Sequence, residues 1–204
     1  MRWLVLYLRS RRVPLALIIA MVTIALVWGL WLTYAESRTI NVRLMSLTVM
    51  LVVTAMGATL SGADDALDST ASINWPVRRA GHLVLTASTI ITLVSLTGLT
   101  DARFEPLTIV LRDTMGMLGL VALGATLLGA ARSWIAPLTW TLIVVLPMMG
   151  PSEQVKTQVA SWPIQSAGTT AATICAGGLA ATGLIAYTLR GCPRRPAAAT
   201  TPDQ

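Results

Sequence analysis

Long uncharged apolar runs, separated by short polar segments, dominate the chain. Six runs are long enough to cross a bilayer: residues 13–35, 44–63, 80–100, 114–131, 133–152 and 167–189. A helix of about 20 apolar residues spans the hydrocarbon core, whereas a membrane-crossing β-strand needs only about 10 residues. The pattern therefore predicts an all-α polytopic membrane protein with six transmembrane helices in one domain, residues 13–189.

Composition narrows the class of protein further. Of the 204 residues, 54% are hydrophobic and only 12% are charged, whereas soluble domains have about 25% charged residues. The net charge of +6 does not indicate a nucleic-acid partner, because the basic residues flank the apolar runs. The length leaves no room for a further soluble domain of about 100 residues, so an energy-converting domain would have to be a separate chain.

The basic residues also predict the orientation. With a cytoplasmic N-terminus, ten of them lie on the inner side: Arg2, Arg9, Arg11, Arg12, Arg78, Arg79, Arg132, Arg190, Arg194 and Arg195. Five lie on the outer side: Arg38, Arg43, Arg103, Arg112 and Lys156. Because short cytoplasmic loops carry the excess of Lys and Arg, both termini are predicted to be cytoplasmic, in a bacterial cytoplasmic membrane.

The two ends of the chain are predicted to lie outside the bilayer core. Residues 1–12 have the pattern of an interfacial amphipathic helix. Its predicted membrane anchors are Trp3, Arg9, Arg11 and Arg12. The alternative is a basic tail that only sets the topology. Residues 190–204, which hold three prolines and an Ala/Thr run, are predicted to be a disordered cytoplasmic tail.

Two connections are long enough to have structure of their own. The cytoplasmic one, residues 64–81, begins with three aspartates, which suit the first turn of a short helix. It ends in the interfacial residues Trp75, Arg78 and Arg79. It is either a docking element or a capped linker. The outer one, residues 150–166, is either a pair of broken helices that re-enter the outer leaflet or a solvated loop.

Candidate chemistry is sparse. His82 has no Cys, Asp or Glu within a helical turn, so we expect a packing or surface histidine and no metal site. Cys175 and Cys192 are predicted to be separate thiols. The only lysine, Lys156, is in the outer loop, so the chain has no phosphate-binding Walker motif. We expect no enzyme activity and no cofactor in this chain.

The predicted spans contain no Asp, Glu, Lys or Arg. The cluster Asp101, Arg103, Glu105, Arg112 and Asp113 is predicted to be a solvated, salt-bridged outer loop. Ion-coupled carriers usually hold ionisable residues near the membrane midplane, so transport by this chain would take its energy from a partner. Small residues spaced for helix packing are Gly168, Ala172, Ala176 and Ala180, together with Gly124 and Gly129.

Four stretches resemble the six-span permease subunits of ABC exporters of the ABC-2 type, especially the short actinobacterial forms. They are RSRRVPLAL (Arg9–Leu17), LDSTASINWPVRRAGHL (Leu67–Leu83), SWPIQ (Ser161–Gln165) and AYTLRGCPRR (Ala186–Arg195). The resemblance implies an elbow helix, a coupling helix and an exofacial hairpin for the first three.

The same resemblance implies the partners. The residues that would face an ATP-binding cassette ATPase are Asp64, Asp65, Leu67, Asp68, Thr70 and Ala71, with Trp75, Arg78 and Arg79 as membrane anchors. Mg-ATP would bind to that ATPase, and a second permease copy or a related permease would complete the pathway for a hydrophobic or amphipathic substrate. The alternative function is a membrane scaffold or sensor subunit without a pathway.

Overall fold

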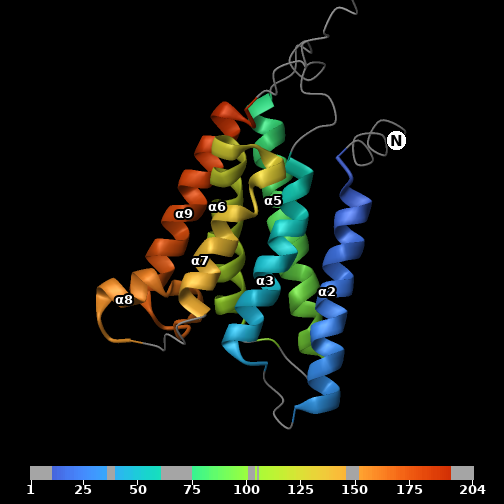
Figure 1. Cartoon of the computed structure of the whole chain (residues 1–204), viewed down its shortest axis with the longest axis vertical. Helices are drawn as coiled ribbons and strands as arrows, with labels where there is room; N and C mark the ends of the chain where they lie inside the picture. Colours follow the sequence, from blue (N-terminus) through green and yellow to red (C-terminus); the bar gives the residue numbers. More distant parts are fainter. Residues whose placement is uncertain are drawn as a thin grey trace, which may run out of the picture.

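The computed structural model describes residues 11–35, 40–60, 75–100, 104, 106–145 and 152–193, and within these ranges the chain is helical with no strand. The helices are α2 (Val13–Tyr34), α3 (Val42–Gly57), α5 (Trp75–Leu96), α6 (Leu107–Leu128), α7 (Ile135–Val145), α8 (Val155–Ala160) and α9 (Thr170–Arg190). Short 3-10 turns cover Ala58–Leu60, Thr97–Leu99, Ala130–Arg132 and Trp162–Ile164. The long helices run side by side along the longest axis (Figure 1).

Within the described residues, five helices are long and apolar enough to cross a membrane, which supports the predicted membrane protein of the all-α class. They are Val13–Tyr34, Val42–Leu60, Trp75–Leu99, Leu107–Leu128 and Thr170–Arg190. The predicted fifth span, residues 133–152, falls short. Its apolar helical part covers only Ala130–Val145, and residues 146–151 lie outside the described ranges.

Two helices begin earlier in the sequence than the uncharged runs. α5 begins at Trp75, five residues before the predicted span, so the three anchor residues of the cytoplasmic connection lie in this helix. α6 begins at Leu107 rather than at residue 114. Local signals explain several other helix ends: Pro14 lies in the first turn of α2, and the Asn41 side chain accepts a hydrogen bond from the backbone N–H of Arg43 at the start of α3.

α6 forms the centre of the bundle. In its most apolar stretch 72% of the residues are buried, compared with 17% in α2. α6 packs against α9, α3, α5 and α7, and the contact with α9 is the most extensive in the molecule. α2 lies at one flank, next to α3, and exposes most of its surface (Figure 1).

The contact between α6 and α9 depends on two glycines. A Cβ on Gly119 would collide with the backbone of Leu179, and one on Gly183 would collide with the backbone of Gly119. Of the predicted packing residues, Ala172 and Ala176 are buried and Ala180 is half-buried. Gly168 is exposed, precedes α9, and has no neighbour that a Cβ would meet. Its prediction as a packing residue was wrong.

The two ends of the described chain meet at one end of the bundle, which we call the Leu60 end. Arg11 donates a hydrogen bond to the Leu60 carbonyl at 3.1 Å, and the Tyr187 hydroxyl donates to the same carbonyl. The Cys192 sulfur lies 4.0 Å from it. The opposite end carries Trp162 and is called the Trp162 end. The first and last described residues, Arg11 and Pro193, therefore belong to the same end of the bundle.

Candidate functional site

A groove of about 770 Å³ runs between α5, α6 and α9, within the size range of small-molecule sites. Its lining comes from three helices and one connecting residue: Leu83, Val84, Ala87, Ser88 and Ile91 of α5; Thr108, Leu111, Arg112, Met115, Leu118, Gly119 and Ala122 of α6; Ala167; and Thr173, Ala176, Gly177, Ala180, Ala181 and Leu184 of α9. The lining is mainly apolar.

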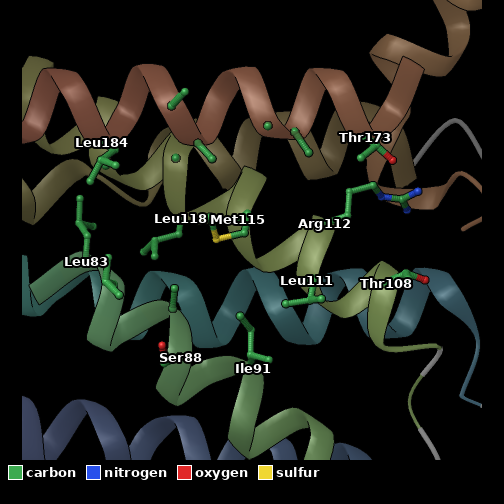
Figure 2. Close-up of a pocket in the computed structure, with 18 of the residues that line it drawn as sticks. Leu83, Ser88, Ile91, Thr108, Leu111, Arg112, Met115, Leu118, Thr173 and Leu184 are labelled. Atoms are coloured by element: carbon green, nitrogen blue, oxygen red, sulfur yellow. The ribbon is translucent and has the colours of Figure 1, made fainter. Parts of the chain in front are cut away.

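The groove opens on the side of the bundle. Val84 is 57% exposed, Met115 43% and Leu184 37%, although all three line it. The close-up shows Leu83, Leu118 and Leu184 toward one end and Thr108, Arg112 and Thr173 toward the other (Figure 2). The first end faces Leu60 and the second faces Trp162. An apolar molecule that lies beside the helices has direct access to this surface.

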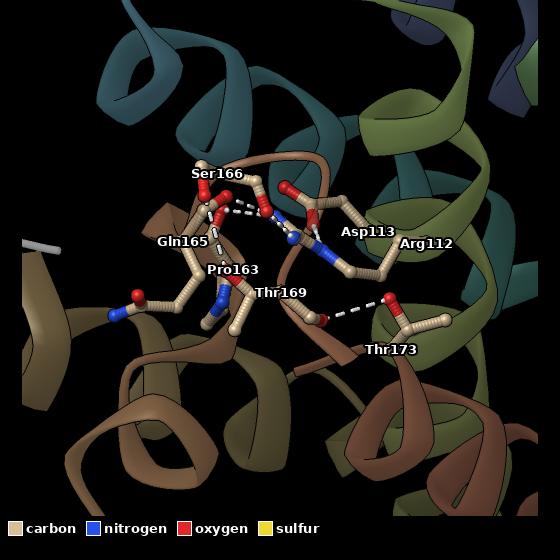
Figure 3. A network of polar contacts seen from close by, with 7 residues as sticks. All are labelled: Arg112, Asp113, Pro163, Gln165, Ser166, Thr169 and Thr173. Atoms are coloured by element: carbon tan, nitrogen blue, oxygen red, sulfur yellow. Dashed lines mark hydrogen bonds and ion pairs between the residues drawn. The ribbon is translucent and has the colours of Figure 1, made fainter. Parts of the chain in front are cut away.

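Arg112 closes the Trp162 end of the groove with hydrogen bonds. Its guanidinium donates to the backbone carbonyls of Ser166 at 3.0 Å, Gln165 at 2.8 Å and Pro163 at 3.4 Å (Figure 3). Its Nε donates to Asp113 Oδ1 at 3.1 Å. Arg112 thus joins α6 to the segment 161–166, which lies about 50 residues later in the chain.

Asp113 balances the charge of Arg112 inside the bundle. Its side chain is 0% exposed and that of Arg112 is 3% exposed. The prediction that both belong to a solvated outer loop was wrong, and so was the prediction that the spans lack ionisable residues. Burial is tolerated because the two charges pair and the guanidinium is hydrogen-bonded. The second carboxylate oxygen of Asp113 has no hydrogen-bond partner within the described residues.

The segment 161–166 lies inside the protein for most of its length. Ser161, Trp162 and Gln165 are 0%, 0% and 1% exposed, and the Trp162 ring packs directly on Gly116 of α6. Irregular backbone at membrane depth is stable only where protein covers it, and Arg112 supplies donors to its carbonyls. Residues 161–165 therefore pack into the bundle, while re-entry of the outer connection into the leaflet stays a prediction.

A second polar network ties four parts of the chain together at the Leu60 end. Arg11 is 5% exposed and donates to the carbonyls of Leu60 and Thr59, so it caps the end of α3 instead of reaching toward lipid head groups as predicted. The Thr59 hydroxyl lies 2.9 Å from His82 Nε2. His82 is buried, in agreement with the packing interpretation.

Four of the other predicted membrane anchors lie within the described residues: Arg12, Trp75, Arg78 and Arg79. The Arg78 guanidinium lies 5.9 Å from the Trp75 ring centroid, a cation–π distance. Arg79 donates to the Thr188 carbonyl at 3.4 Å and packs on Gly191, which ends α9 with a positive φ of 69°. Arg12 is exposed, with a φ of 54°. Trp3 and Arg9 lie outside the described residues.

The predicted ATPase-docking residues, Asp64, Asp65, Leu67, Asp68, Thr70 and Ala71, all fall within residues 61–74, outside the described ranges. The interfacial helix of residues 1–12 is described only at Arg11 and Arg12, and the predicted tail only from Arg190 to Pro193. The structure places the polar network of the Leu60 end directly before residue 61.

Sequence reasoning missed the Arg112 network, although a signal for it exists. The apolar residues Leu107, Ile109, Val110 and Leu111 follow Pro106 and precede Arg112, a pattern typical of a helix that begins at residue 107. A search for uncharged runs cuts this helix at the charged pair. The partner carbonyls at residues 163–166 have no sequence signal.

Comparison with known proteins gave no relatives: no family model, no curated protein and no solved structure matches this chain.

Proposed function

We propose that the chain is the permease subunit of an ATP-driven exporter, as its resemblance to the ABC-2 type permeases implies. The observation that carries the proposal is the groove between α5, α6 and α9, which is apolar, opens sideways and ends in a polar cap at Arg112. A hydrophobic or amphipathic substrate such as a peptide, an antibiotic or a lipid-like molecule fits such a surface.

The energy source in this proposal is a separate ATP-binding cassette ATPase that binds Mg-ATP. The chain has no Walker motif, and its predicted docking loop starts at the Leu60 end. The hydrogen bonds of Arg11, Tyr187 and His82 connect that end to α2, α9 and α5. Movement of the loop would therefore reach the helices that form the groove.

Two permease subunits and six crossings per subunit belong to the same proposal. The short helix α7 packs against α3 and α6. Together with the preceding 3-10 turn it would bring the number of crossings to six. α2 leaves most of its apolar surface exposed. That surface also favours the second candidate function, a scaffold or sensor subunit that binds another membrane protein without transport.

Co-purification and transport together test the proposal. The tagged chain, extracted from its own host in mild detergent, should bring an ATPase of this class with it, and vesicles holding the complex should take up substrate only with ATP. Uptake driven by a proton gradient without ATP would contradict the proposal, and Asp113 would then be the first residue to examine. Absence of an ATPase would favour the scaffold.

Replacement of Asp65 and Asp68 by Ala tests the docking loop. Neither residue is in a predicted span, so insertion should be unchanged, while association with the ATPase should weaken and depend less on salt. Binding and transport equal to the unmodified protein would show that the loop is only a linker.

A further inference from the structure

The groove has the length of one membrane leaflet. On α9 it extends from Thr173 to Leu184, and at a rise of 1.5 Å per residue these 11 steps cover about 17 Å. Half of a hydrocarbon core about 30 Å thick is about 15 Å. A single hydrocarbon chain that lies along the groove would therefore run its full length.

The polar groups of the groove are concentrated at one end. Thr108 and Thr173 carry hydroxyls there, next to Arg112, while Leu83, Leu118 and Leu184 line the other end (Figure 2). The Thr108 side chain is exposed, and its hydroxyl has no acceptor among the described residues. The Arg112 side chain is only 3% exposed, and its hydrogen bonds are to Asp113 and to carbonyls of the segment 161–166, so it lies beneath this end of the groove.

We propose that this groove binds one hydrocarbon chain of a phospholipid-like amphiphile, with the oxygen-rich head group at the Trp162 end beside Thr108 and Thr173. The groove supplies apolar surface for the chain, and the Thr108 hydroxyl supplies a hydrogen bond for the head group. The Thr173 hydroxyl already donates to the Thr169 carbonyl at 3.1 Å. Identification of the amphiphile as the exported substrate rests on the proposed function; the binding site itself does not.

The polar end also argues against a helix of a second copy as the occupant. An apolar helix packed into the groove would cover the exposed Thr108 hydroxyl, which would then find no acceptor. Burial of an unpaired polar group is unfavourable. A head-group oxygen accepts a hydrogen bond from this hydroxyl, so the amphiphile satisfies this end and the helix does not.

Two neighbouring glycines of α9 provide a matched test. Gly177 lines the groove and Gly178 does not. Both are exposed, and a Cβ on either one meets no atom within 4 Å. Gly177→Leu should therefore fill the groove without disturbing the helix packing, and Gly178→Leu makes the same chemical change on the adjacent surface. Ala181→Leu, also in the groove lining, is a second filling variant.

The probe is phosphatidylglycerol with a photoactivatable diazirine in one acyl chain, mixed into vesicles that contain the purified chain alone. Mass spectrometry should locate cross-links on Met115, Leu118 or Ala181. Labelling should fall at least about fivefold in Gly177→Leu and stay unchanged in Gly178→Leu. Thr108→Val, which removes one hydrogen bond, should reduce labelling by about 2- to 10-fold.

Equal labelling of the two glycine variants, or labels confined to other surfaces, would overturn the site. A chain-to-chain disulfide formed efficiently by Gly177→Cys, but not by Gly178→Cys, would assign the groove to a second copy. Binding without ATP-driven transport would keep the site and reject the exporter. Normal transport by Gly177→Leu, with labelling lost, would keep the site and the exporter but reject the bound amphiphile as the exported substrate.

Discussion

Removal of the Arg112 side chain should release the segment 161–166 from the bundle. Arg112→Met keeps a long apolar side chain but loses the ion pair at 3.1 Å and the bonds to the carbonyls of Gln165 and Ser166 at 2.8 and 3.0 Å. Loss of one partner from a buried ion pair costs about 3–5 kcal/mol. The carbonyls left without a donor lose further stability.

A cost of this size strongly shifts the equilibrium between the packed and the detached segment. Since each 1.36 kcal/mol is a factor of ten, about 3 kcal/mol raises the population of the detached segment by roughly 150-fold. The global fold should survive, because the contacts of α6 with α3 and α9 do not involve this side chain alone.

A cysteine in place of Ser161 reports the detachment. Ser161 is 0% exposed, so the thiol reacts with a membrane-impermeant maleimide only when the segment opens. With Cys175 and Cys192 replaced by Ala, Arg112→Met should raise the labelling rate by at least about 100-fold, within the 3–5 kcal/mol range of a broken buried pair.

A second variant and a control make the result decisive. Arg112→Met combined with Asp113→Leu removes both charges, so it should open the segment less than Arg112→Met alone. Arg132→Met removes an exposed arginine from the far end of α6 and should leave the rate unchanged. If Arg112→Met were labelled at the same rate as the protein with Arg112, Arg112 would not be what holds the segment 161–166 against the bundle.

Two further predictions concern topology and helix packing. In a chain without its native cysteines, Gln154→Cys should react with an impermeant thiol reagent in intact cells, whereas Ser72→Cys should react only after permeabilisation; the reverse would invert the orientation derived from the basic residues. Gly119→Ala should lower the unfolding temperature in detergent through an overpacking cost of about 1–3 kcal/mol, because its Cβ would meet the Leu179 backbone. Gly29→Ala has open space around the new Cβ and should be neutral or stabilising; equal destabilisation of both would reject the close approach of α6 and α9.

The sequence by itself determined the class of protein and the course of most helices. Transfer into a bilayer core depends on the apolarity of about 20 consecutive residues, which is a local property. For this reason α2, α3 and α9 begin and end within a few residues of the predicted spans. The predicted fifth span is described only in part: α7 ends at Val145, and residues 146–151 lie outside the described ranges.

Only the tertiary structure decided the candidate site. The charges of Arg112 and Asp113 suggest a loop when they are considered locally, yet both are buried because carbonyls 51 to 54 residues later accept the guanidinium hydrogens. The α6–α9 contact likewise requires Gly119 and Gly183 to meet, which neither sequence segment specifies alone. Burial of a polar or small residue depends on the partner that covers it, and that partner comes from a distant part of the chain.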